Sequence, residues 1–281
     1  MNEVNDNLQM NIKVTILGTG TSSGVPQLGC TCPTCTSSDK RDKRLRCSSI
    51  LEIDDPQSPD GITRILFDCG PDFRQQMMEF GFKRIDAIFI THEHYDHVGG
   101  LDDLRPFSIF GDMKVYADEY SVKHLRQRMP YCFTPKEIRY PGVPKIDLET
   151  IQPGNPVYVN GISVMPIQVM HGKLPILAFR IDDFAYITDM KYIEESQLQL
   201  LKGVKHMVVN ALRHEPHPTH QTIREAISFA DSLNVEKAYF IHMCHQIRPH
   251  AQECLDLPPN RFFAYDGMTF NISSNEQNDN F

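Results

Sequence analysis

The segment Thr91-His92-Glu93-His94-Tyr95-Asp96-His97 is the most informative part of this 281-residue sequence. It follows the apolar run Ile85–Ile90, which has the composition of a buried strand. His92 and His94 lie two residues apart, so on extended chain their side chains point the same way and can share one metal ion. The carboxylate and imidazole on the following turn can reach a second ion. Imidazole and carboxylate suit zinc, manganese or iron, and two such ions can clamp a hydrolytic transition state.

The composition limits the kind of protein that carries this segment. A chain that is 41% hydrophobic and 23% charged is typical of a globular protein rather than a disordered one. Its formal net charge of −8 argues against nucleic acid as a partner, and we interpret the basic run Lys40–Arg46 as a solvated loop. No run approaches 18 consecutive apolar residues, so no membrane span is expected. Because Met1–Asn11 lacks the apolar core of a signal peptide, we expect a cytoplasmic location.

Apolar runs predict strands that alternate with amphipathic helices, and hence layered sheets covered by helices. We expect strands at Ile12–Leu17, Ser49–Ile53, Thr63–Phe67, Ala87–Ile90, Met113–Tyr116, Ser163–Met170, Ile176–Ile181, Phe184–Thr188, Met207–Val209, Lys237–Ile241 and Met268–Ile272. We expect helices at Pro71–Glu79, Glu119–Arg128, Ile193–Leu201 and Thr222–Asp231. The pair Asp182-Asp183 predicts a tight hairpin turn. Without repeats or linkers, the sequence predicts one α/β domain over residues 1–281, with a frayed polar tail from about 273.

The segment His92–His97 resembles the signature of the metallo-β-lactamase superfamily. That resemblance implies an αββα sandwich with a two-metal site along one edge of the sheets. It also implies further ligands, and the sequence contains suitable residues in order, each at the end of an expected strand. The implied ligands are His92, His94 and His171 for the first ion, Asp96, His97 and His242 for the second, and Asp189 between the two.

Asp68, in Leu66-Phe67-Asp68-Cys69-Gly70, resembles an aspartate of the same superfamily that supports the site from behind the ligands. A metal-bound histidine usually gives its second N–H to such an acceptor, which fixes the tautomer of the ring.

A second candidate site is the loop at about residues 29–47, where Cys30-Thr31-Cys32-Pro33-Thr34-Cys35 places three thiols within six residues. Thiolates this close favour zinc, and a closed tetrahedral site needs a fourth ligand. Cys47, in the same loop, and His245, from far along the chain, are both candidates. Reactive or redox cysteines are the competing interpretation.

Three features together resemble the phosphoribosyl cyclic phosphodiesterases of the carbon–phosphorus lyase pathway, a subgroup of the superfamily. They are the turn Gly18-Thr19-Gly20, the loop Gly29–Cys35 and the segment His242-Met243-Cys244-His245. The resemblance implies that Cys30, Cys32, Cys35 and His245 bind a structural zinc. The tRNA 3′-processing endonucleases of the superfamily carry a long Gly/Pro-rich arm that clasps RNA, and this sequence has no such arm.

A general acid is expected just before the helix at Thr222, where that subgroup has a histidine. His220 aligns best with it, His217 is close enough to be the acid instead, and His214 is a weaker candidate. An imidazole suits the role because its unperturbed pKa lets it donate a proton near neutral pH.

The sequence therefore predicts a dinuclear hydrolase that cleaves a small phosphodiester, with a cyclic ribose phosphate as one option, by metal-hydroxide attack. The expected cofactors are two catalytic divalent ions, zinc or manganese, and one structural zinc. Arg105 or Arg213 could hold a second phosphate. Two alternatives stay open: hydrolysis of a lactone, thioester or other ester on the same fold, and a non-catalytic, metal-stabilised binding protein. A homodimer is also left open.

Overall fold

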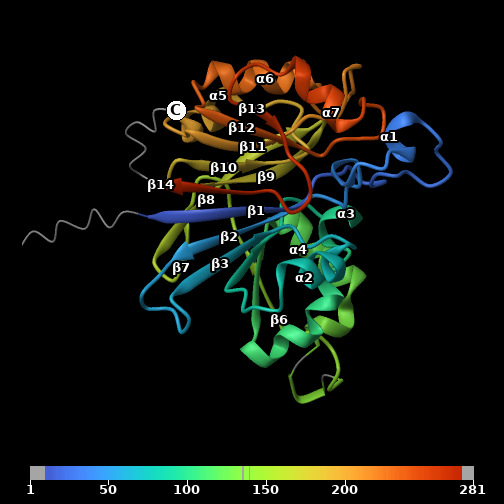
Figure 1. Ribbon diagram of the computed structural model, residues 1–281. Helices are drawn as coiled ribbons and strands as arrows, with labels where there is room; N and C mark the ends of the chain where they lie inside the picture. The colour runs from blue at the N-terminus through green and yellow to red at the C-terminus, as the bar shows by residue number, and fades with distance from the viewer. Residues whose placement is uncertain (1–9, 135, 139, 274–281) are drawn as a thin grey trace, which may run out of the picture.

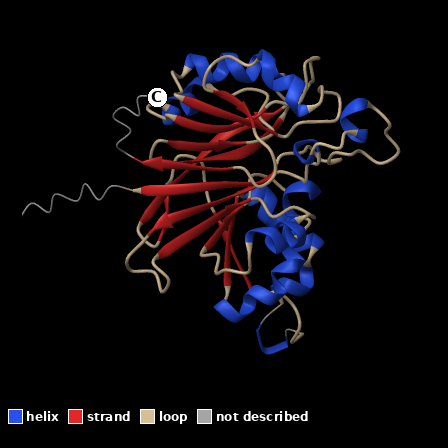
Figure 2. Cartoon of the chain, viewed as in Figure 1, coloured by secondary structure: helices blue, strands red, loops and turns tan. Residues whose placement is uncertain are grey.

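The computed structural model describes residues 10–134, 136–138 and 140–273. Two seven-stranded sheets lie face to face with helices on their outer sides, which confirms the expected αββα sandwich (Figures 1 and 2). The strands of the first sheet are, in spatial order, β14 (Thr269–Ser273), β1 (Asn11–Gly18), β2 (Ser48–Asp54), β3 (Ile62–Phe67), β4 (Ala87–Phe89), β5 (Met113–Ala117) and β6 (Ile146–Thr150). Those of the second are β13 (Arg261–Phe263), β12 (Lys237–Ile241), β11 (His206–Asn210), β10 (Phe184–Ile187), β9 (Leu174–Ile181), β8 (Ile162–His171) and β7 (Val157–Val159).

Helices cover the outer face of each sheet. On the first sheet they are α2 (Phe73–Phe80), α3 (Tyr95–Val98), η2 (Leu101–Phe110), α4 (Glu119–Arg128) and η3 (Pro130–Phe133), followed by η4 (Lys136–Ile138). On the second they are α5 (Glu195–Leu198), η5 (Gln199–Leu201) and α6 (Ile223–Ser232), followed by α7 (His250–Glu253) and η6 (Cys254–Asp256). The loop after β1 carries α1 (Pro33–Thr36) and η1 (Lys40–Asp42) and projects from one end of the sandwich (Figure 1).

The main core lies between the two sheets. Phe67 of β3 stacks on Tyr186 of β10 and on Phe179 of β9, with ring centroids 4.9 and 5.4 Å apart, so the two sheets interlock through aromatic rings. Because the inner strands are covered on both faces, they read as nearly continuous apolar runs rather than alternating ones.

Parallel strands place their carboxyl ends at one edge of the sandwich. In the first sheet β3, β4, β5 and β6 run parallel, and in the second β10, β11, β12 and β13 do. The loops that follow these strands therefore meet at one edge, which is where open α/β sheets place their ligands. The strands expected from the sequence are present, and the Asp182-Asp183 hairpin joins β9 to β10.

Two expectations concern the chain ends. Ser273, where a frayed tail was expected to begin, is the last residue of β14, and residues 274–281 lie outside the described residues, as do residues 1–9. Within the described part of the chain, no helix combines the length and the apolarity that a membrane span requires.

Candidate metal centre

Three of the residues expected at the metal site follow strands and have backbone conformations in the left-handed region. Asp68 after β3, Asp189 after β10 and His242 after β12 have φ values of 60°, 56° and 57°. Non-glycine residues rarely adopt this conformation, and such strained positions cluster at functional sites. Each strand thus ends in a sharp turn that directs its polar side chain to the common edge.

The first cluster consists of His92, His94 and His171. One ring nitrogen of each lies within 4.8 Å of the others, which is close enough for all three to hold one ion. His92 and His94 come from the loop between β4 and α3, and His171 is the last residue of β8. The structure therefore brings together residues that are nearly 80 positions apart in the sequence.

The second cluster consists of Asp96, His97, Asp189 and His242, all of them buried. Asp189 lies between the two clusters and uses its two oxygens differently. Its Oδ1 is 3.1 Å from His242 Nε2 and 3.4 Å from His97 Nε2, whereas its Oδ2 is 3.8 Å from His92 Nε2. This arrangement could bridge two ions.

The chemistry of the donors fits divalent metal ions. The Nε2 atoms of His92, His97 and His242 are buried and have no hydrogen-bond partner among the described residues. A buried polar atom without a partner costs free energy, so an ion at each cluster would satisfy otherwise unpaired imidazole nitrogens. Histidine with carboxylate is a donor set that zinc and manganese both accept.

Two of the ligand histidines, His97 and His171, have their Nδ1 atoms held by the protein. His97 Nδ1 lies 2.8 Å from Asp68 Oδ2, and Thr91 donates its backbone N–H and its hydroxyl to the same carboxylate. His171 Nδ1 lies 2.9 Å from the carbonyl oxygen of Asp189 and 3.0 Å from that of Thr219. Each contact places a proton on Nδ1 and leaves the Nε2 lone pair for an ion.

Before any ion binds, Asp189 and His92 have the ionisation states of metal ligands, whereas His97 does not. Burial would lower the pKa of His97, but Asp96, Asp189 and Asp68 outweigh it and raise that pKa well above its ordinary value, so this ring has to lose a proton to become a ligand. Burial alone would raise the pKa of Asp189, but the nearby His242 and His97 outweigh it and hold that pKa well below its usual range. Burial lowers the pKa of His92 well below its ordinary value, so the ring is neutral and has a free lone pair. A carboxylate that is ionised and an imidazole that is neutral are the states that bind metal.

The three histidines that the sequence offered as the general acid have different surroundings. His220 is buried, with ring centroids 4.6 Å from His171 and 4.8 Å from His242, and its Nδ1 lies 3.9 Å from Asp189 Oδ2. His217 is half-buried, 5.0 Å from the His220 ring. His214 is elsewhere, because its Nε2 lies 2.5 Å from Glu253 Oε1. Burial, together with the neighbouring histidines, lowers the pKa of His220 to about 3.

The cysteine loop forms a separate cluster with His245. Ligand atoms of Cys30, Cys32, Cys35 and His245 all lie within 4.8 Å of one another, and His245 Nδ1 is 3.1 Å from Cys30 Sγ. Cys47 does not join this cluster. It is fully buried beside the histidine–aspartate cluster, where burial raises its pKa well above the ordinary value and His97 and Asp189 are its charged neighbours.

The two sites share one chain segment. His242 of the second cluster and His245 of the cysteine cluster are three residues apart, with Met243 and Cys244 between them. Met243 exchanges backbone hydrogen bonds with the loop after β1, donating to Thr19 and accepting from Thr21. The cysteine cluster is therefore placed to fix the segment that carries His242.

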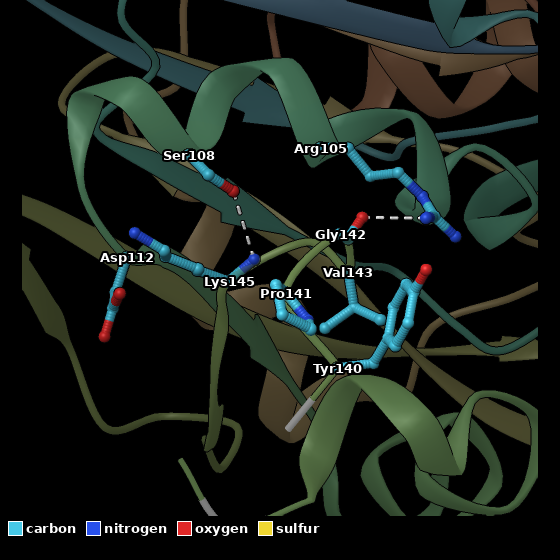
Figure 3. A pocket seen from close by; sticks show the side chains of 8 residues that line it. All are labelled: Arg105, Ser108, Asp112, Tyr140, Pro141, Gly142, Val143 and Lys145. Atoms are coloured by element: carbon cyan, nitrogen blue, oxygen red, sulfur yellow. Dashed lines mark hydrogen bonds between the residues drawn. The ribbon is translucent and has the colours of Figure 1, made fainter. Parts of the chain in front are cut away.

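The two arginines that the sequence suggested for binding a second phosphate lie in different parts of the structure. Arg105 lines a pocket of η2 and the loop at 140–145, where its guanidinium binds the Asp102 carboxylate and the Gly142 carbonyl oxygen (Figure 3). None of the residues lining that pocket belongs to a metal cluster. Arg213 lies on the loop that carries His217 and His220. Sequence reasoning gave no role to Thr91 or Thr219, which contact His92 and His171, because a lone threonine carries no recognisable signal.

Residues 63–243 match the family model of the beta-lactamase superfamily domain. An octanoyltransferase of Porphyromonas gingivalis is 40% identical over 92% of the chain, but the chain spans only 51% of that relative. A coenzyme PQQ synthesis protein B of Methylobacterium radiotolerans is 32% identical over 36% of the chain and 37% of the relative. Among solved structures, a diphosphatase of the PhnP family has a TM-score of 0.85, with 34% identity over 95% of this chain and 99% of that one. Zinc-bound PqqB from Methylobacterium extorquens has a TM-score of 0.72 at 20% identity over 92% and 99% of the two chains, a likeness of fold.

Proposed function

Because this chain belongs to the beta-lactamase superfamily and has the metallo-β-lactamase fold of its metal-dependent hydrolases, we propose that it hydrolyses a small phosphodiester. The observation that carries the proposal is the position of Asp189, whose two carboxylate oxygens face two different ligand clusters. Likeness to a PhnP-family diphosphatase over nearly the whole of both chains supports phosphorus, rather than carbon, as the centre attacked.

In this proposal the chain holds two catalytic ions and one structural ion. The residues assigned are His92, His94 and His171 for the first ion, Asp96, His97 and His242 for the second, Asp189 as the bridge, and Cys30, Cys32, Cys35 and His245 for a structural zinc. When bound, the catalytic pair would lower the pKa of water to supply a nucleophile and would neutralise charge on the phosphate oxygens.

The residues of the chain orient the ligands and move a proton. Asp68 holds the His97 ring, and the carbonyl oxygens of Asp189 and Thr219 hold the His171 ring, so neither ring has to reorganise during turnover. His220 is assigned the proton transfer to the departing alkoxide, since its ring contacts the rings of both His171 and His242. Its pKa is low in the substrate-free chain, and an anionic phosphate beside the ring would raise that pKa because opposite charges stabilise the imidazolium.

The test is hydrolysis of bis(p-nitrophenyl) phosphate by the zinc- or manganese-loaded protein, with metal content measured by elemental analysis. A parallel panel contains a p-nitrophenyl ester, a lactone, a chromogenic β-lactam and an octanoyl thioester, the last because a longer relative is named an octanoyltransferase. We expect cleavage of the diester that disappears on chelation and in Asp189→Ala.

Two results would decide against the proposal. Turnover confined to an ester, lactone or thioester would establish the ester-hydrolase alternative on the same fold. Full metal loading with no turnover of any substrate in the panel would favour a metal-stabilised binding protein.

A further inference from the structure

Asn210, the last residue of β11, binds the backbone of the residue that follows Asp189. Its Oδ1 accepts a hydrogen bond from Met190 N–H at 2.8 Å, and its Nδ2 donates to Met190 O at 3.0 Å. Both residues are completely buried. Because a backbone N–H can only donate and a carbonyl oxygen can only accept, the two contacts also fix which atom of the amide is the oxygen. Asn210 therefore clamps Met190 by both of its backbone polar groups.

The clamp lies where the chain leaves β10 in a sharp turn. Asp189 has a φ of 56°, in the left-handed region that non-glycine residues rarely adopt. Such a conformation persists only where the surrounding contacts hold it. Thr188 donates its hydroxyl to Asp189 Oδ1 at 2.7 Å and so holds the side chain, whereas Asn210 holds the backbone. Together the two contacts leave the bridging carboxylate little freedom.

The peptide group between Asp189 and Met190 connects Asn210 to the first cluster. Its N–H donates to Asn210 Oδ1, and its carbonyl oxygen lies 2.9 Å from His171 Nδ1. Because a peptide group is planar, its N–H and its C=O cannot rotate separately. A contact that fixes the N–H therefore also fixes the oxygen that orients the His171 ring.

The Met190 carbonyl oxygen extends the clamp to the segment that carries His220. This oxygen accepts from Asn210 Nδ2 and, at 3.1 Å, from the N–H of Gln221, the residue after His220. Asn210 is itself held in the second sheet, because β11 pairs with β10 on one side and with β12, which leads to His242, on the other. One side chain behind the ligands thus contacts the chain segment on which both clusters depend.

We propose that Asn210 is a positioning residue of the metal centre, which fixes the bridging carboxylate and the His171 ring relative to each other through the Asp189–Met190 peptide. Asn210 belongs to neither group of candidate ligands and acts through Asp189 and His171. The inference rests on the two-ion centre of the proposed function and adds a residue outside the ligand set. Residues that orient ligands in this way contribute to metal affinity although they bind no metal.

The test uses Asn210→Leu, which fills a similar space and removes both hydrogen bonds. Asn210→Ser, with a smaller polar side chain, is the second variant if the first does not fold. Thr63→Val is the matched control, because it also removes a completely buried polar group with two hydrogen bonds, to Asp55 and to Asn160. Thr63 lies near the start of β3, whereas the site lies beyond the ends of the strands.

Two measurements on the metal-loaded protein do not depend on turnover. Competition with a chelator gives the affinity for the catalytic ions. Electron paramagnetic resonance of the manganese-loaded protein shows whether two ions are bridged, because bridged Mn²⁺ ions are spin-coupled. We expect the Asn210 variants to raise the Kd for the catalytic ions about 10- to 100-fold and to weaken the coupling. Thr63→Val should lower stability but keep the affinity and the spectrum of wild type.

Hydrogen exchange of the metal-free protein tests the clamp itself. The Met190 N–H should be protected from exchange in wild type and should exchange about 10-fold faster in the Asn210 variants, the effect of one lost hydrogen bond. A Met190 amide that exchanges freely in wild type would overturn the proposal.

Wild-type metal affinity and spin coupling in the Asn210 variants would overturn the proposal as well. Equal losses in the Asn210 variants and in Thr63→Val would also overturn it, because they would show a general effect of lower stability. If the Asn210 variants lose metal affinity but loaded wild type cleaves no diester, the hydrolysis proposal fails while Asn210 keeps its positioning role.

Discussion

Asp68 Oδ2 lies 2.8 Å from His97 Nδ1, and both side chains are completely buried. Asp68→Asn keeps the size of the side chain and tolerates the left-handed backbone, but it removes the charge that makes His97 a stronger ligand. We expect metal affinity to fall about 10- to 100-fold, measured by competition with a chelator. Asp147→Asn, an exposed position on β6, is the control, and equal affinities in the two variants would contradict the role of Asp68.

His220→Ala should lower kcat on an alkyl phosphodiester about 100- to 10,000-fold, the contribution of one general acid. The loss should be smaller on bis(p-nitrophenyl) phosphate, because p-nitrophenolate leaves without a proton. Metal content should not change. One of the metal-compatible groups contains His220 with His171 and Asp189, so a lower metal content in the variant would make His220 a ligand rather than an acid.

Cys32 and Cys35 should differ in reactivity once metal is removed. Burial opposes ionisation of Cys32, but the Cys35 backbone N–H and His245 outweigh it and lower its pKa to about 6, whereas burial raises the pKa of Cys35 to about 11. The thiolate is the reactive form, so alkylation of Cys32 should rise with pH through about 6 and then level off, while Cys35 stays slow at pH 8. Mass spectrometry of chelator-treated protein after brief iodoacetamide exposure measures this. Equal rates at pH 7 would contradict it.

Cys35→Ser should reduce the metal content from three ions per chain to two. It should also lower activity, since His245 lies three residues from His242 and its cluster fixes that segment. Elemental analysis and thermal unfolding measure the two effects. Cys254→Ser changes a thiol outside the cluster and should keep three ions. Two ions in wild type would contradict the structural site.

Gly70→Ala should damage the second cluster without touching a ligand. A Cβ at Gly70 would lie 2.1 Å from the backbone oxygen of Asp96, so the turn carrying Asp96 and His97 would have to move. We expect about 1–3 kcal/mol lower stability by chemical denaturation, with weaker metal binding. Gly142→Ala is the control, because a Cβ there meets side chains rather than backbone, Tyr140 at 3.3 Å and Arg105 at 4.0 Å. Unchanged metal affinity in Gly70→Ala would show that the turn can adapt.

The central strands could be predicted because burial on both faces makes them apolar throughout. β6, β7 and β13 were missed, and all three lie at or next to the free edges of the sheets. β6, with the sequence Ile146-Asp147-Leu148-Glu149-Thr150, is mostly exposed. An edge strand has only one neighbouring strand and is partly exposed. Its sequence is therefore short and polar, and it resembles that of a loop.

For the candidate site, the ligand types and their order along the chain could be predicted, but not which loops meet. The residues alone left Cys47 and His245 both open as the neighbour of the thiols, and only the family resemblance favoured His245. The fold brings His245 to the thiols, whereas Cys47, which is closer in sequence, turns into the core. The separation of His214 from His217 and His220 depended on its partner Glu253, a residue 39 positions away. Such contacts are set by tertiary packing and have no local signature.

β14 pairs antiparallel with β1, with Ser273 opposite Asn11, so the first and last described strands are neighbours in one sheet. Thr19, on the loop after β1, binds the Asp266 carboxylate through its N–H and its hydroxyl. During synthesis, β14 must therefore leave the ribosome before β1 gains this neighbour. A nascent chain that has not yet reached His242 likewise lacks a ligand of the second cluster. Pairing over such long sequence separations makes folding slow, so the second cluster is completed late in folding.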